Sequence, residues 1–239
     1  MKVIQLLFLA LLTLNSVNAQ NNSVLIIAGG HSYDTLAFAS MFDQMEGVNY
    51  DFMLQPEANR YLASIDIPPY SLLIFYDMWE PISEEGKAAY IRFTEKGVPM
   101  LFLHHALVSY QAWPEFEKII GGKYVQTLKN ETRDKSELST YKHDVWVDVE
   151  VVDPAHPVTF GMKNFRLFDE VYGNYKVGET VTPLLRTNHP ESTPVIAWEN
   201  VYNNSTIIYI QPGHSKSAYN DKNYRKLLYQ AIKYLQSTN

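Results

Sequence analysis

The chain has 239 residues, with 20 Lys and Arg against 26 Asp and Glu, which gives a net charge of −6 at pH 7. An acidic chain lacks the basic face that neutralises a phosphate backbone, so nucleic acid is not an expected partner. Its 46% hydrophobic and 19% charged residues are typical of globular proteins. There is no cysteine, which excludes disulfides, cysteine-ligated zinc, iron–sulfur clusters and a thiolate nucleophile.

The first 19 residues have the pattern of a signal peptide. Lys2 supplies a positive charge, Val3 to Leu14 form an apolar stretch, and Val17-Asn18-Ala19 has the small residues of a cleavage site. We therefore expect cleavage after Ala19 and export to the periplasm or the medium. No later apolar run of about 18 residues predicts a membrane span, and residues 20–239 are expected to form a single domain.

The first half of the mature chain alternates between two patterns. Short β-branched or apolar runs predict buried strands, and longer segments with helical spacing of apolar residues predict helices. The strands are expected at residues 24–28, 50–54, 71–76 and 98–103, and the helices at 35–45, 83–96 and 113–120. Such alternation predicts parallel strands joined by right-handed crossovers, hence a three-layer, doubly wound α/β fold.

The second half has a different pattern. Short strands separated by turn residues are expected at 145–152, 166–172, 182–186, 194–198 and 206–211, and a closing amphipathic helix at 221–235. The polar stretch 129–142 is expected to be a mobile loop. The sequence thus predicts a mostly parallel sheet with an antiparallel extension in the C-terminal half.

Four of the seven histidines follow predicted strands: His31, His104, His105 and His214. Ligands of open α/β sheets bind outside the carboxyl ends of the strands, so these side chains are expected to meet in one cleft. The alternative is that a histidine beside Gly or Pro simply suits a loop. His143, His156 and His189 lie in polar or proline-bounded segments and are expected to shape turns.

Asp169 and Glu170 stand next to each other inside an apolar run that also contains Tyr172. Burying two carboxylates is costly unless each has a partner. We expect one to face the cleft and the other to orient a neighbouring group, unless the run is an edge strand with one polar face. Trp113, in a loop after a strand, is a candidate platform for a sugar, although such residues more often belong to the core.

Six short segments occur in an order that resembles the trehalose-utilisation (ThuA-like) family, which has the fold of the class I glutamine amidotransferase-like superfamily. They are Ala28-Gly-Gly-His31, Phe102-Leu-His-His-Ala106, His156-Pro157, Asp169-Glu-Val-Tyr172, Pro194-Val-Ile-Ala-Trp198 and Gly213-His214. The resemblance covers essentially the whole mature chain. It implies a flavodoxin-like core and a role in the use of trehalose-like disaccharides or their keto derivatives.

The sequence departs from the wider superfamily at the nucleophile. Amidotransferases place a Cys or Ser at the turn that here reads His104-His105, and this chain has no cysteine. Glutamine hydrolysis through a thioester is therefore excluded, while the superfamily's histidine after the last strand is matched by His214.

Three functional hypotheses remain open, and each has a small-molecule carbohydrate as partner. A homo-oligomer is possible under all three. In the first, the cluster performs acid–base catalysis on a keto-sugar as a lyase, isomerase or hydrolase. In the second, three histidines with Glu170 or Asp169 hold a divalent zinc, manganese or iron ion, although no diagnostic ligand spacing is present. In the third, the protein binds carbohydrate or assembles without catalysis. The first assigns catalysis to His105, Glu170 and His214, and substrate binding to His31, His104, Asp169, Tyr172 and Trp113.

Overall fold

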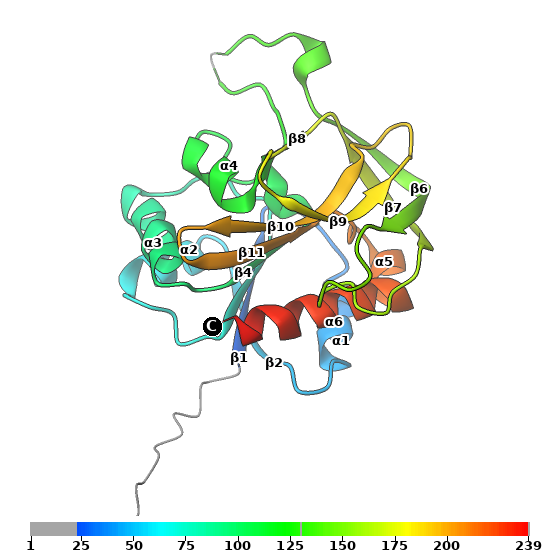
Figure 1. The fold of residues 1–239 in the computed structure, drawn as a ribbon. Helices are drawn as coiled ribbons and strands as arrows, with labels where there is room; N and C mark the ends of the chain where they lie inside the picture. The colour runs from blue at the N-terminus through cyan, green and yellow to red at the C-terminus, as the bar shows by residue number, and fades with distance from the viewer. Residues whose placement is uncertain (1–22, 130, 239) are drawn as a thin grey trace, which may run out of the picture.

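A computed structural model describes residues 23–129 and 131–238 (Figure 1). The predicted signal peptide and its cleavage site lie outside these residues. Within the described part of the chain, no helix is long and apolar enough to cross a membrane.

Five parallel strands form the first half of the sheet. They are β1 (Ser23–Gly29), β2 (Asn49–Leu54), β3 (Leu72–Asp77), β4 (Met100–Leu103) and β11 (Ser205–Ile210), in the order β2-β1-β3-β4-β11. β3 and β4 are buried along their whole length because helices cover both faces, which explains their uninterrupted apolar sequences. The carboxyl ends of β1, β3, β4 and β11 consequently lie at one edge of the sheet.

Four antiparallel strands continue the same sheet beyond β11. They are β10 (Val195–Tyr202), β9 (Thr182–Thr187), β6 (Thr140–Val151) and β7 (Phe165–Gly173), in that spatial order. A separate two-stranded sheet pairs β5 (Gly122–Lys123) with β8 (Lys176–Val177). The α/β prediction with an antiparallel extension is confirmed.

Helices pack on both faces of the parallel strands, which gives three layers (Figure 1). One face carries α1 (Thr35–Asp43), α5 (Lys216–Asn220) and α6 (Lys222–Ser237), and the other carries α2 (Glu57–Ser64), α3 (Glu84–Glu95) and α4 (Pro114–Ile120). The last helix begins where the Asp221 carboxylate accepts the backbone N–H groups of Asn223 and Tyr224. Its apolar stripe, which includes Leu227 and Leu228, is fully buried.

Part of the polar stretch 131–142 has secondary structure that the sequence does not predict. It contains a 3₁₀ turn, η2 (Lys135–Glu137), and the first residues of β6, which starts at Thr140. The register of β6 against β7 shifts between Lys142 and Val145, and Asp144 there has a φ of 56°. This β-bulge changes the direction of the side chains around it. Because its residues are polar and exposed, the apolar pattern of the sequence does not indicate a strand here.

Gly30 closes the turn after β1 and is expected to tolerate no side chain. Its φ is 81°, and a Cβ there would lie 1.8 Å from the Met78 carbonyl oxygen. Gly30→Ala is therefore expected to lower the free energy of unfolding by about 3 kcal/mol or more, because both the backbone conformation and the contact are unfavourable. Denaturant unfolding measures the change.

Gly47 provides the matched control. Its φ is 68°, but the nearest atom to an added Cβ is the flexible Lys233 Nζ at 3.4 Å. Gly47→Ala should cost only the left-handed backbone penalty of about 1 kcal/mol. Equal losses in the two variants would contradict the role assigned to the Met78 carbonyl.

Candidate active site

His104 occupies the turn that follows β4, at the start of the 3₁₀ helix η1 (His104–Val108). Its φ is 43°, a left-handed conformation that costs free energy for any residue except glycine, and its side chain is fully buried. Strained turns of this kind are common where a fold must present a reacting group.

Both ring nitrogens of His104 have neighbours. Nδ1 contacts the Gln211 carbonyl oxygen, which can only accept, so Nδ1 carries a proton. Nε2 lies 2.8 Å from Glu170 Oε2, 3.0 Å from the Tyr172 hydroxyl and 3.2 Å from His214 Nδ1. His104 is thus the centre of a polar cluster whose residues come from η1, β7 and the loop after β11.

Glu170 and His214 form an ion pair in this cluster, with Oε2 2.9 Å from Nδ1. Burial alone would raise the pKa of Glu170, but hydrogen bonds with His104 and His214 outweigh it and lower the pKa to about 2. Burial opposes the charge on His214 too, yet the Glu170 carboxylate raises the pKa of that imidazole above its usual value. The lowered pKa of Glu170 and the raised pKa of His214 both favour the charged form of each residue.

Asp169 points away from Glu170 and anchors the loop that carries His214. Its Oδ2 accepts the Gly213 N–H at 2.6 Å, and its Oδ1 accepts the His214 N–H at 3.0 Å. Burial raises the pKa of Asp169 against these hydrogen bonds and the nearby His104. The adjacent carboxylates therefore have separate tasks: Glu170 faces the cluster, and Asp169 positions a loop.

His105 stacks on His31, with ring centroids 4.0 Å apart. The side chain is 2% exposed, and neither of its ring nitrogens has a hydrogen-bond partner in the structure. Burial, reinforced by the neighbouring imidazoles, lowers the pKa of His105 well below its usual value, so its ring is neutral. A neutral, unpartnered imidazole can accept a proton or bind a metal ion.

A cavity of about 230 Å³ opens beside the cluster. Four of its lining residues belong to the predicted site: His31, His105, Glu170 and Tyr172. Its full lining is His31, Met78, His105, Val108, Tyr124, Gln126, Tyr141, His143, Glu170 and Tyr172. The combination of aromatic rings, an amide and titratable groups suits a small polar ligand.

The structure brings together His31, His104, His105, Glu170, Tyr172 and His214, and it places Asp169 behind them. Trp113 lies elsewhere. It is 9% exposed, packs among Tyr90, Tyr110 and Phe116, and does not line the cavity. Its aromatic neighbours in α3 and α4 assign it to the core, so the sequence-based expectation of a sugar platform receives no support from its position.

His143 is a cavity residue that the sequence analysis missed. Its Nδ1 lies 3.3 Å from Glu170 Oε1, and its ring centroid lies 4.8 Å from that of His214. The bulge in β6 places it there, and nothing in the local sequence indicates this. His156 and His189 do shape turns, since the Nδ1 of each accepts the backbone N–H two residues later.

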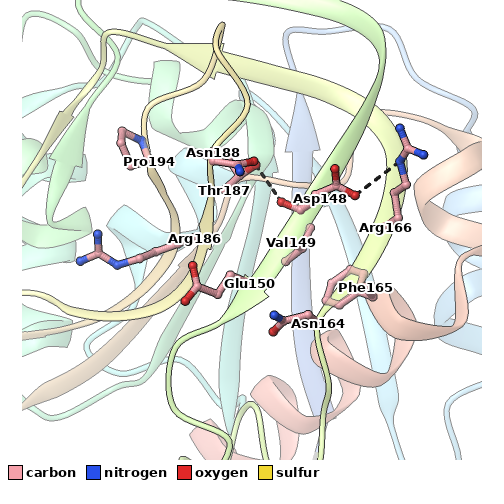
Figure 2. A pocket seen from close by; sticks show the side chains of 10 residues that line it. All are labelled: Asp148, Val149, Glu150, Asn164, Phe165, Arg166, Arg186, Thr187, Asn188 and Pro194. Atoms are coloured by element: carbon pink, nitrogen blue, oxygen red, sulfur yellow. Dashed lines mark hydrogen bonds and ion pairs between the residues drawn. The ribbon is translucent and has the colours of Figure 1, made fainter.

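A second groove, of about 670 Å³, lies over β6, β7 and β9 (Figure 2). It shares no lining residue with the histidine cavity. Asp148 forms a 3.5 Å ion pair with Arg166, and the Thr187 hydroxyl donates to the Asp148 carbonyl oxygen (Figure 2). Because these groups interact with one another, the histidine cavity is the stronger candidate for a ligand site.

Asp77 lies behind the cavity, next to the lining residue Met78. It is fully buried and accepts a 2.7 Å hydrogen bond from Gln55 Nε2. Burial raises the pKa of Asp77 to about 7. The native protein therefore holds this proton at pH values where the unfolded chain has released it.

Asp77→Asn should remove this pH dependence. As pH rises from about 4 to 7, proton release from the unfolded chain lowers the stability of the native protein, and above the folded pKa no further change follows. The difference in unfolding free energy between the native protein and the variant should shift by up to about 4 kcal/mol across this window, in favour of the variant as pH rises. If the unfolding free energies of the native protein and Asp77→Asn differ by the same amount at every pH, the raised pKa assigned to Asp77 is wrong.

Comparison with known proteins places this geometry in context. A sequence model of the ThuA family, described as trehalose utilisation, matches residues 23–235. Among curated proteins, none matches the chain.

Several solved structures share the fold. A putative ThuA-like protein from Parabacteroides merdae has a TM-score of 0.73 at 17% identity, with 91% of this chain and 90% of that chain covered. One from Bacteroides uniformis has a TM-score of 0.68 at 20% identity, with coverage of 92% and 94%. PurLQS from Thermotoga maritima has a TM-score of 0.54 at 15% identity, with coverage of 90% and 99%. The arrangement of strands and helices is common to all three.

Proposed function

The chain belongs to the ThuA family of trehalose utilisation, and on that premise we propose that it binds a carbonyl-containing sugar in the histidine-lined cavity and transforms it by acid–base chemistry. The observation that carries the proposal is His105. Two ring nitrogens that are buried without hydrogen bonds lower the stability of the folded protein. Such unpaired buried groups often have a role in binding or catalysis. The ring lines the cavity beside the Glu170 carboxylate.

In the proposed reaction, His105 accepts a proton from the carbon next to the sugar carbonyl. The electron pair of that C–H bond moves to the carbonyl oxygen, which becomes an enolate oxygen. The His214 imidazolium, which Glu170 holds in place, stabilises this oxygen. Isomerisation follows when the hydroxyl of the first carbon passes its proton to the enolate oxygen and His105 returns its proton to the former carbonyl carbon. Elimination follows when the enolate re-forms the carbonyl, a C=C bond forms, and the β-substituent leaves with its bonding electron pair and takes up the proton held by His105.

The cavity favours a single sugar ring over a longer oligosaccharide. Its volume of about 230 Å³ is below the range of about 300 to 1,000 Å³ that is usual for larger ligands. Tyr124, Gln126 and Tyr141 offer hydroxyl and amide groups to sugar hydroxyls. A disaccharide would therefore place one ring inside and the other at the mouth.

Proton abstraction is tested directly in D₂O. The purified protein is incubated with trehalose, simple glucosides and their 3-keto derivatives, and mass spectrometry measures deuterium uptake and product formation. Uptake above the enzyme-free rate is expected for keto-sugars and not for parent sugars, which lack the carbonyl. Binding without uptake would replace the proposal with a carbohydrate-binding function, and neither binding nor uptake would contradict both.

We further propose that the protein is exported. The supporting observation is the order of charge, apolar stretch and small residues in the first 19 positions. N-terminal sequencing of protein from the native host should begin at Gln20. Recovery of intact Met1 from the cytoplasm would contradict this prediction.

A further inference from the structure

Three donor atoms from distant parts of the chain meet at one point next to the cavity. His104 Nε2, His214 Nδ1 and Glu170 Oε2 are separated by 2.8, 2.9 and 3.2 Å. Together with a ring nitrogen of His105, all four donors lie within 4.8 Å of one another. We propose that His104, His214 and Glu170 bind a divalent transition-metal ion, with His105 as the adjacent fourth group.

The hydrogen bonds around His104 support this proposal. Nδ1 donates to the Gln211 carbonyl oxygen, so Nε2 is the ring nitrogen directed toward Glu170. Nε2 lies 2.8 Å from Glu170 Oε2 and 3.2 Å from His214 Nδ1. A divalent cation among these three atoms would be bound by two imidazole nitrogens and one carboxylate oxygen.

The spacing of the three atoms fits a metal site. Ligands about 2.0 to 2.2 Å from one ion, in tetrahedral or octahedral geometry, lie roughly 3 Å apart. The three observed separations bracket this value. Two imidazoles and one carboxylate are donors that zinc, manganese and iron all accept.

The groups behind the three donors resemble the support that metal ligands normally have. The Gln211 carbonyl oxygen fixes the ring of His104, and Gln211 Nε2 donates to the backbone oxygen of Glu170 at 3.0 Å. Asp169 holds the backbone of His214. Such outer contacts orient ligands and set the tautomer of a bound histidine.

Three protein ligands leave a coordination position free. The role of the ion rests on the proposed function: it would supply the positive charge that stabilises the oxygen of a bound sugar carbonyl. Metal binding itself rests only on the geometry of the cluster, so the two proposals can fail independently.

Metal content and affinity test the inference. The protein is purified without chelator and without a histidine tag, and its metals are measured by inductively coupled plasma mass spectrometry. Metal-stripped protein is then titrated with Zn²⁺ by calorimetry and with Co²⁺ by visible absorption. One ion per chain is expected, together with Co²⁺ bands typical of nitrogen and oxygen ligands.

Variants locate the ion. His214→Ala and Glu170→Gln should each weaken Zn²⁺ binding at least about tenfold, with folding checked by circular dichroism. His156→Ala is the matched control, because His156 Nε2 lies 3.4 Å from Glu199 Oε2 in another His/Glu pair away from the cavity. Unchanged affinity in both cluster variants, or less than one tenth of an ion per chain after Zn²⁺ addition, would overturn the inference.

Assays of deuterium uptake from keto-sugars test the proposed reaction separately from metal binding. Undiminished deuterium uptake by metal-stripped protein would overturn the ion's place in the reaction and leave the acid–base proposal intact. Stoichiometric metal binding without uptake from any keto-sugar would support the site and contradict the proposed reaction.

Discussion

His105→Leu is expected to lower sugar turnover by about 10²- to 10⁴-fold while leaving the free energy of unfolding unchanged or slightly higher. The ring of His105 is buried and makes no hydrogen bond, so an apolar side chain of similar size removes a cost without breaking a contact. Loss of activity without loss of stability distinguishes a reacting group from a structural one. Deuterium uptake and denaturant unfolding measure the two quantities.

His189→Ala is the control for this substitution. His189 Nδ1 accepts the Glu191 N–H in a turn, and the side chain does not line the cavity. It should change stability by less than about 0.5 kcal/mol and leave turnover unaffected. Full turnover in His105→Leu would show that the reaction takes place elsewhere.

Asp169→Ala should strongly destabilise the protein. It leaves the buried N–H group of Gly213 and the partly buried N–H group of His214 without an acceptor, and a buried unpaired group costs about 1 to 3 kcal/mol. We expect the free energy of unfolding to fall by about 2 to 4 kcal/mol, with turnover also reduced because His214 loses its support. Asp169→Asn keeps one acceptor oxygen, so its free energy of unfolding should lie between those of the native protein and Asp169→Ala.

Asp153→Ala is the matched control, since Asp153 Oδ1 also accepts a backbone N–H, from Ala155, but in an exposed turn. Its effect should stay below about 0.5 kcal/mol. A loss in Asp169→Ala no larger than this would show that the loop holds His214 without the carboxylate.

The parallel half of the fold can be predicted from sequence because its strands are buried on both faces and appear as apolar runs. The same logic brings His31, His104 and His214 to one edge of the sheet, since parallel strands end together. Helix α2 was missed, since only Ala58 and Leu62 supply its buried apolar contacts. A short amphipathic segment with so few apolar residues gives a weak pattern.

The remaining cavity residues depend on tertiary structure. His143 contacts Glu170 because β6 has a bulge there, and no alternation of apolar residues in the sequence predicts this shift in register. Trp113 follows a predicted strand, as a ligand-binding residue often does, but its ring packs against aromatic residues of α3 and α4. Sequence position indicates which edge of the sheet a residue occupies, whereas packing decides whether it faces solvent, ligand or core.

Glu170 lies on β7, the last strand of the nine-stranded sheet, yet it contacts His104 at the end of β4. These residues are 66 positions apart, and His104 and His214 are 110 apart. The histidine cavity needs residues from both halves of the sheet, so it forms only when the antiparallel half has packed against the parallel half. A ligand of this cavity therefore binds only the completely folded sheet. By mass action, a sugar present at 100 times its Kd would add about 2.7 kcal/mol to the stability of the entire protein, and thermal protection by a sugar would report on folding and binding at once.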